Sequence, residues 1–409
     1  MAEWMLPKHQ APVRFRYPAY RHMKILSIET SCDETAVSII EAKGGFEAPS
    51  FRVLSNLVLS QVKVHEKYGG VFPNLAKREH AKNLGPLLKK SVEEAGLFIP
   101  RTCRLDEQVS QSIKADLHRE PELFVDLVDF FESCEIPKID LIAVTFGPGL
   151  EPALWVGINA AKVLGRVWGI PVIPINHMEG HISSVLLDLH DPVRFPALAL
   201  LISGGHTELV SVPDWLMYKV VGETKDDAVG EAYDKVARML GLVYPGGPRV
   251  AALANEARHD PLIKSRFSFP RPMLKSPDFN FSFSGLKTSV LYTIKKIEYL
   301  SDEIKKEIAL SFEDAVVETL ITKTRNALTE FGARTLIVAG GVIANQTLRD
   351  SFETLVLEFP DLKLLVPTGP LSTDNALMIA LAAYVRYSKT PKVKYSLDDI
   401  HAEGNARLS

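Results

Sequence analysis

One pattern occurs twice along this chain of 409 residues, and it limits the folds that the chain can adopt. The apolar segments 24–28 and 197–202 are each followed by a turn rich in Gly, Ser or Thr and then by a second strand-like segment. Later in each half, at 141–149 and at 335–341, an apolar segment runs into glycine and then into a helix-like stretch. This duplication predicts two α/β halves with a ligand crevice between them.

The composition agrees with two domains and excludes several classes of protein. A formal net charge of −3 provides no global positive field, so RNA binding would depend on local basic patches. The three cysteines are odd in number and lack CxxC spacing, which indicates a reducing compartment. The longest apolar runs, such as 376–385, are about half as long as a bilayer requires. We therefore expect no membrane partner.

We place the N-terminal half at 24–195, joined by 383–400, and the C-terminal half at 196–382. Residues 97–138 are rich in acidic side chains and look like an insertion, and their helical apolar spacing predicts one or two surface helices. Residues 1–23 are basic and contain prolines. Two interpretations of that segment stay open, a basic tail and the remainder of an organelle-targeting leader.

His177 and His181 have the spacing of a metal-binding pair. If this segment is helical, the two imidazoles lie on one face and can bind one cation together with a third ligand from elsewhere. The same spacing also arises by chance. Asp374 opens a predicted helix, where an aspartate is more often a cap than a ligand. The residues alone leave the metal site open.

The glycine-rich turns at 203–207 and 340–341 suit anion binding. Without Cβ atoms, their backbone N–H groups can approach phosphate oxygens closely. A helix predicted to begin at about Asn345 would add the partial positive charge of its N-terminus. The sequence contains neither a P-loop nor a GxGxxG motif, so the expected phosphate site is neither of the Walker nor of the Rossmann type.

Taken in order, the motifs resemble those of the TsaD family, the tRNA N6-adenosine threonylcarbamoyltransferases. The likeness runs from about Lys24 to Tyr384 and leaves out the insertion at 97–138. It rests on motifs that include residues 28–35 (IETSCDET), 68–71 (YGGV), 78–80 (REH), 147–149 (GPG), 177–181 (HMEGH), 203–207 (SGGHT), 244–248 (YPGGP), 281–287 (FSFSGLK) and 372–374 (STD). The resemblance implies the duplicated α/β fold of actin, hexokinase and the ATP-driven heat-shock chaperones (ASKHA, RNase H-like), with the active site in the inter-domain crevice.

The resemblance also implies roles for particular residues. His177, His181 and Asp374 would bind one divalent metal ion per subunit, zinc or iron, and Asp33 and Glu34 match positions that are needed for activity. The residues that would hold the adenylate are Ile202, Ser203, Gly204, Gly205, His206, Asp234, Gly247 and Asn345.

The implied reaction moves a threonylcarbamoyl group from threonylcarbamoyl-AMP, which a separate synthase makes, to a tRNA. The acceptor is N6 of the adenosine 3′ of the anticodon in tRNAs reading ANN codons, and AMP is released. We also expect a homodimer. Because the adenine amine is a poor nucleophile, proton removal would help its attack, and Asp33 or Glu34 is our hypothetical base.

Departures from the family pattern locate the chain within it. His206 and Leu201 stand where archaeal and cytosolic members have Asn and a metal-binding Tyr, so the chain resembles the bacterial and organellar branch. The insertion at 97–138 and the basic segment 1–23 favour the mitochondrial matrix, with the bacterial cytoplasm as the alternative.

Two rival functions arise from the same features. A zinc peptidase of the HExxH type needs its Glu next to the first His, whereas Glu179 is two residues on and about 200° around the helix. An ATP-dependent kinase or chaperone-like ASKHA protein is the main alternative, because a fold does not fix a function. For tRNA, we expect Phe281 or Phe283 to stack on an unpaired base. The predicted basic patches are Lys77, Arg78, Lys82, Lys89 and Lys90, and Arg266, Arg271, Lys275 and Lys287.

Overall fold

A computed structural model describes residues 22–44, 49–189, 191–390 and 395–408. The chain divides into two compact units. Unit 1 comprises Met1–Gln61, Val71–Leu189 and Asp374–Arg407, and unit 2 comprises Val62–Gly70, His190–Thr373 and Leu408–Ser409. Most of the basic segment at 1–23 therefore lies outside the described residues. None of the described helices is long and apolar enough to cross a membrane.

Unit 1 contains a mixed five-stranded sheet with the order β3-β2-β1-β4-β5. Its strands are β1 (His22–Glu29), β2 (Glu34–Lys43), β3 (Ser50–Ser60), β4 (Leu141–Gly147) and β5 (Val172–Asn176). The central β1 pairs antiparallel with β2 and parallel with β4. Both faces of β1 are covered, and its residues from Ile25 to Glu29 are all buried, including the polar Ser27 and Glu29.

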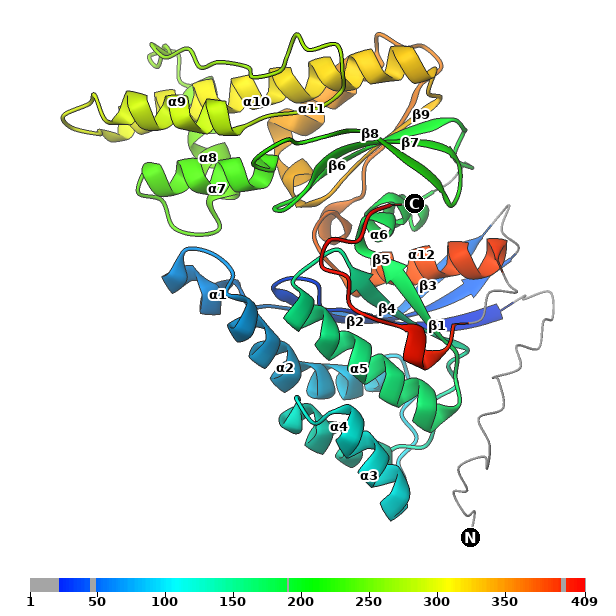
Figure 1. Ribbon diagram of the computed structural model, residues 1–409. Coiled ribbons are helices and arrows are strands. Elements are labelled where there is room, and N and C mark those ends of the chain that lie inside the picture. Colours follow the sequence, from blue (N-terminus) through cyan, green and yellow to red (C-terminus); the bar gives the residue numbers. More distant parts are fainter. Residues whose placement is uncertain (1–21, 45–48, 190, 391–394, 409) are drawn as a thin grey trace. The chain divides into compact units, whose positions relative to one another are not determined.

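Helices cover both faces of this sheet (Figure 1). The helices α2 (Pro73–Glu94) and α5 (Glu151–Trp168) pack on the face that carries Leu26 and Ile28. Helix α12 (Ala376–Lys389) lies on the other face, where the Ser27 hydroxyl donates to the Ala376 carbonyl at 2.7 Å. The short helix α6 (His177–Ser183) follows β5 directly. In the sequence-based division, the chain returns to the first half at residue 383. In the structure, the last segment of unit 1 begins at Asp374, ahead of α12.

The segment predicted as an insertion forms two helices, α3 (Glu107–Asp116) and α4 (Pro121–Ser133). Most of their apolar side chains are buried and join the core formed by α2 and α5. At the start of α4 the buried Glu120 forms an ion pair with Lys77 of α2 at 3.0 Å. The insertion is thus an integral layer of unit 1.

Unit 2 repeats the strand order of unit 1. Its sheet has the order β10-β9-β6-β7-β8, in which the first strand of the unit, β6, again lies between the second and the fourth. The strands are β6 (Ala197–Ile202), β7 (Thr207–Asp214), β8 (Met217–Glu223), β9 (Thr335–Ala339) and β10 (Lys363–Leu365). As in unit 1, the central strand pairs antiparallel with the second and parallel with the fourth. The predicted duplicated α/β fold is confirmed.

The core of unit 2 is formed by the sheet and its helices. These are α7 (Val229–Met239), α8 (Gly246–His259), α9 (Ser284–Ile294), α10 (Asp302–Phe331) and α11 (Gln346–Val356). The remaining short helices of the described chain are α1 (Val62–His65), η1 (Glu66–Tyr68), η2 (Ser184–Leu186), η3 (Gly341–Ala344), η4 (Gly369–Ser372) and η5 (Leu397–Asp399). Helix α11 begins as predicted, because the Asn345 side chain accepts a hydrogen bond from the Leu348 N–H and caps it.

Candidate functional site

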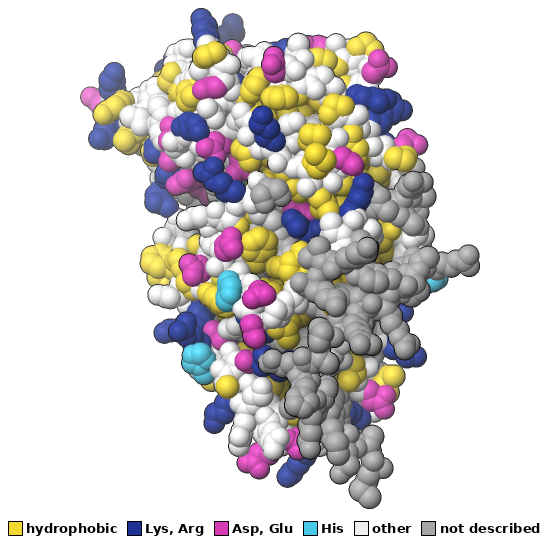
Figure 2. Space-filling view, turned by 45° about the vertical axis from the view of Figure 1, so that its right-hand side comes forward, with side chains coloured by type: hydrophobic (Ala, Val, Ile, Leu, Met, Phe, Trp, Pro, Cys, Tyr) yellow, Lys and Arg dark blue, Asp and Glu magenta, His cyan; other side chains and the backbone are white. Residues whose placement is uncertain are grey.

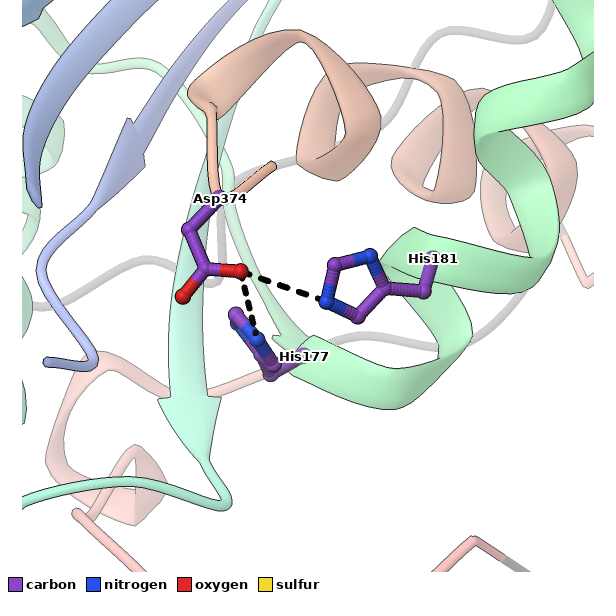
Figure 3. A group of neighbouring side chains, drawn as sticks. All are labelled: His177, His181 and Asp374. Atoms are coloured by element: carbon purple, nitrogen blue, oxygen red, sulfur yellow. Dashed lines mark ion pairs between the residues drawn. The ribbon is translucent and has the colours of Figure 1, made fainter. Parts of the chain in front are cut away.

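The two histidines of the HMEGH motif project from α6 toward each other (Figure 3). Asn176 caps this helix, because its Oδ1 accepts hydrogen bonds from the N–H groups of Met178 and Glu179 at 2.9 and 3.4 Å. The imidazole rings of His177 and His181 have their centroids 4.8 Å apart and are almost perpendicular. One turn of α6 thus brings the two imidazole rings close enough to bind the same ion.

Asp374 completes a cluster with these histidines. Its Oδ1 lies 3.4 Å from Nε2 of His177 and 3.3 Å from Nε2 of His181 (Figure 3). The cap of α12 is the neighbouring Asn375, whose Oδ1 accepts from the Met378 N–H at 3.0 Å. Asp374 therefore faces the histidines instead of capping the helix, and all three residues belong to unit 1.

The His181 ring shows that the cluster fits a metal ion. Its side chain is fully buried; among the described residues Nδ1 has no hydrogen-bond partner, and Nε2 lies 3.3 Å from the Asp374 carboxylate. A buried polar group without a partner costs about 1–3 kcal/mol. One ligand atom from each of the three residues lies within 4.8 Å of the others. Two imidazoles and a carboxylate are a donor set that suits zinc or iron.

Charge–charge interactions dominate this cluster. Burial by itself would lower the pKa of His177, but the carboxylates of Asp374 and Glu29 raise it well above its ordinary value. Burial would raise the pKa of Asp374, and the two histidines instead hold it well below its ordinary value. The Asp374 carboxylate therefore stays ionised, as a metal ligand must be.

Glu179 is turned away from the cluster. Its buried carboxylate forms an ion pair with Arg386 of α12, with distances of 2.6–3.0 Å to the guanidinium nitrogens. The prediction that Glu179 points away from a metal on α6 is confirmed. The pair also ties α6, which carries both histidines, to the helix that follows Asp374.

The two carboxylates predicted to be catalytic follow β1 in unit 1. Asp33 is buried, and the Glu34 carboxylate accepts a hydrogen bond from the Ser60 hydroxyl at 3.2 Å. Burial raises the pKa of Glu34 to about 9, and the negative charges of Asp33 and Asp374 add to this effect. Glu34 is therefore protonated at neutral pH. The charge of Asp374 acts on Glu34, so Glu34 lies near the histidine–aspartate cluster.

Glu29 is a buried carboxylate at this site that the sequence motifs did not single out. Its Oε2 lies 3.1 Å from Nδ1 of His177. The signal that could have revealed it is a glutamate that directly follows the apolar segment predicted as a central strand.

In unit 2, several residues expected to hold an adenylate lie near the carboxyl ends of β6 and β9. Ser203 and His206 close a tight turn, with a hydrogen bond from the Ser203 N–H to the His206 carbonyl at 2.9 Å. Gly204 and Gly205 within the turn face open space. A Cβ on Gly340 would lie 2.4 Å from the Ile202 carbonyl oxygen, so the loop after β9 packs directly on the end of β6.

Asp234 joins two further positions of this set. Its Oδ1 accepts hydrogen bonds from the N–H groups of Gly246 and Gly247, at 2.7 and 3.2 Å, and so fixes the start of α8 to α7. The amide of Asn345 both caps α11 and donates to the buried Glu313 at 2.6 Å. Asp234 and Asn345 thus hold the backbone of this region in place.

Known proteins resemble this chain over most of its length. A model of the family "TsaD: tRNA N6-adenosine threonylcarbamoyltransferase" matches residues 52–101 and 129–381. A tRNA N6-adenosine threonylcarbamoyltransferase of Persephonella marina is 40% identical over 390 residues, which cover 94% of this chain and 95% of that protein. The enzyme of Thermosipho africanus is 41% identical over 368 residues, covering 90% and 95%.

The chain belongs to the TsaD family. The gap in the family match, at 102–128, falls within the predicted insertion and contains α3 and most of α4. A solved structure of HypF is similar in fold, with a TM-score of 0.51 and 12% identity, covering 91% of this chain and 56% of that one. HypF from T. kodakarensis has a TM-score of 0.50 and 12% identity, covering 92% and 49%. The fold class predicted from the sequence, of the ASKHA type, is confirmed.

For this TsaD-family chain, the predicted aromatic contact with tRNA is wrong. Phe281 and Phe283 are fully buried and stack on each other, with ring centroids 6.2 Å apart, so neither can stack on a base. Many side chains of the predicted basic patches form ion pairs with acidic residues. These pairs are Lys77–Glu120, Lys89–Asp129, Lys90–Glu94, Arg266–Glu307, Arg271–Glu318 and Lys287–Asp227. On the face shown in Figure 2, Lys and Arg side chains lie scattered among Asp and Glu.

Proposed function

We propose that this protein transfers the threonylcarbamoyl group of threonylcarbamoyl-AMP to N6 of the adenosine 3′ of the anticodon in tRNAs reading ANN codons, and releases AMP. The family membership over most of the chain supports this proposal. The observation that carries its chemistry is the cluster of His177, His181 and Asp374, in which Nε2 of the fully buried His181 faces the Asp374 carboxylate at 3.3 Å.

One divalent cation per subunit, zinc or iron, is the cofactor of this proposal. Bound there, it would supply a Lewis acid that orients the donor and polarises its carbonyl or phosphate oxygens. His177, His181 and Asp374 would hold it. Three protein ligands leave coordination positions open for a substrate or water, as in catalytic metal sites.

The donor's adenylate is assigned to unit 2. Backbone N–H groups of the Ser203–His206 turn are the proposed phosphate contacts, because Gly204 and Gly205 leave the space beside them open. Asp234 orients the N–H groups of Gly246 and Gly247 in the same unit. In α/β folds ligands bind outside the carboxyl ends of the strands, which is where Ile202 and the turn lie.

Asp33 is the base that removes the proton from the attacking amine. Of the two candidates, Glu34 has a pKa of about 9 and holds its proton at neutral pH, so it cannot accept another. Glu34 would donate a hydrogen bond to the donor or to the leaving group.

The proposed partners are tRNA, a separate synthase that supplies threonylcarbamoyl-AMP, and a second copy of the chain as a homodimer. Lys90 and Arg266 stay proposed contacts for tRNA, because their side chains are 62% and 64% exposed even within their ion pairs. A mitochondrial location is the proposal for this chain and rests on the insertion and on residues 1–23. The relatives named above are bacterial, and the cytoplasm of a bacterium is the alternative.

A transfer assay tests this function. Purified protein is incubated with threonylcarbamoyl-AMP and unmodified ANN-decoding tRNA, and the digested nucleosides are analysed by mass spectrometry. We expect N6-threonylcarbamoyladenosine to form, together with one AMP for each modified base. Hydrolysis of ATP in the absence of donor and tRNA, without any modified nucleoside, would favour the kinase-like or chaperone-like alternative.

A further inference from the structure

A glutamate at the end of the central strand of unit 1 is buried without access to solvent. Glu29 is the last residue of β1 and is 0% exposed. A buried carboxylate is costly unless charged or polar partners compensate the lost hydration. Its contacts therefore indicate what it does.

The contacts of Glu29 converge from three segments of unit 1. Oε1 accepts a hydrogen bond from the Ser31 N–H at 2.5 Å, in the turn after β1. Oε2 accepts one from the Thr145 hydroxyl of β4, also at 2.5 Å. The same Oε2 lies 3.1 Å from Nδ1 of His177. Backbone and hydroxyl donors thus hold the carboxylate in place beside the imidazole.

The two histidines of the cluster differ in this respect. His177 has a carboxylate, and in addition the Ser31 hydroxyl at 3.2 Å, on the Nδ1 side of its ring. Nδ1 of His181 has no hydrogen-bond partner among the described residues. A carboxylate beside one ring nitrogen fixes the proton there and leaves the lone pair of the other nitrogen for a metal.

We infer that Glu29 is a positioning residue: it accepts a hydrogen bond from Nδ1–H of His177 and so directs Nε2 of His177 toward the metal ion. The inference rests on the metal site of the proposed function. Glu29 does not contact the metal or the substrate itself. It acts across 148 residues of sequence by fixing the tautomer and the plane of one ligand.

Glu29→Gln tests this role with little change in shape. If the amide NH₂ faces Nδ1 of His177, the ring must carry its proton on Nε2, which blocks metal binding there. If the amide is flipped, its NH₂ faces the Ser31 N–H, and two donors oppose each other. We expect the affinity for Zn²⁺, measured by chelator competition, to fall about 10–100-fold. The visible absorption of the Co²⁺-loaded protein should also change.

Glu120→Gln is the matched control, because it removes another buried carboxylate of unit 1, which pairs with Lys77 of α2 and not with the cluster. We expect it to lower the melting temperature and to leave Zn²⁺ affinity and the Co²⁺ spectrum nearly unchanged. If Glu29→Gln behaves like this control, its role is structural only and the inference is wrong.

Thr145→Val provides a second route if Glu29→Gln does not fold. It keeps the carboxylate but removes one of the donors that hold it, and we expect a smaller loss of Zn²⁺ affinity together with a Co²⁺ spectral shift. Unchanged affinity and spectrum in a folded Thr145→Val protein would contradict the inference. Wild-type protein that binds no stoichiometric Zn²⁺ or Co²⁺ would overturn the metal site itself, whereas normal wild-type binding with unaffected variants would overturn only the role of Glu29.

Discussion

The two units share one strand order but differ in the turn after their first strand. In unit 1, the turn after β1 carries Ser31 and Asp33, whose side chains are buried among charged groups. In unit 2, the turn after β6 carries Gly204 and Gly205, which face open space. One copy of the scaffold thus concentrates ionisable groups, and the other exposes backbone. A duplicated fold can divide metal chemistry and anion binding between its halves without any change in topology.

The two turns are packed in the same way against the loop that follows the fourth strand of their unit. In unit 1, a Cβ on Gly149, after β4, would lie 2.6 Å from the Ser31 carbonyl oxygen. In unit 2, a Cβ on Gly340, after β9, would lie 2.4 Å from the Ile202 carbonyl oxygen. In each unit a glycine that follows the fourth strand supports the segment that ends the first. The difference between the turns therefore comes from their side chains.

The largest expected effect comes from a charge in unit 1. Asp33→Asn removes the proposed base and preserves the shape of the side chain, so turnover in the transfer assay should fall about 10²–10⁴-fold. The donor concentration for half-maximal rate should stay within about threefold, because the adenylate contacts are assigned to unit 2. Unchanged turnover would remove Asp33 from the role of base. A large rise in the donor concentration needed for half-maximal rate would contradict the assignment of donor binding to unit 2.

A smaller effect is expected from the backbone of unit 2. Gly340 has a φ of +100°, which residues with a side chain rarely adopt. A Cβ added to it would collide with Ile202. Gly340→Ala should displace the end of β6 and weaken donor binding about 10-fold, with less effect on turnover at saturating donor. Gly341→Ala is the matched control, since nothing lies within 4 Å of its Cβ. Equal donor binding in both variants would argue against a role of this loop in holding the adenylate.

The remaining prediction concerns stability instead of activity. The pKa of Glu34 is raised from 4.5 to about 9 in the folded protein, first by burial and then by the charges of Asp33 and Asp374. Between these values the unfolded chain binds fewer protons than the folded one, so the free energy of unfolding falls as pH rises. Glu34→Gln removes this titration. Its melting temperature should exceed that of the wild type at about pH 8 and approach it at about pH 4.5. A difference independent of pH would contradict the protonated Glu34.

The sequence predicted much of the scaffold because its elements carry local signals. Apolar runs predicted the central strands β1, β4, β6 and β9, and glycines marked where helices end. The edge strand β3 was not predicted, because its side chains are largely exposed and do not alternate clearly between apolar and polar. The duplication could be predicted because both copies keep the same order of strands, turns and helices.

Long-range pairing limited what the sequence could predict about the site. The burial of Phe281 and Phe283 depends on the packing of unit 2, so an aromatic loop looked like a base-stacking surface. Acidic partners of the basic residues, such as Glu120 for Lys77, come from distant segments. From its position at the start of a predicted helix, Asp374 looked like a capping residue. In the structure the adjacent Asn375 caps α12, and the Asp374 carboxylate lies beside the histidines.

The most direct test of the central claim is to measure metal content and transfer together, in the wild type and in His181→Ala. We predict about one zinc or iron per wild-type chain, loss of both metal and transfer after chelation, and recovery of both when the ion is restored. His181→Ala should bind metal at least about 100-fold more weakly and form no detectable modified adenosine at metal concentrations that saturate the wild type. A metal-free wild type that transfers at the full rate, or a His181→Ala protein that does, would contradict the account.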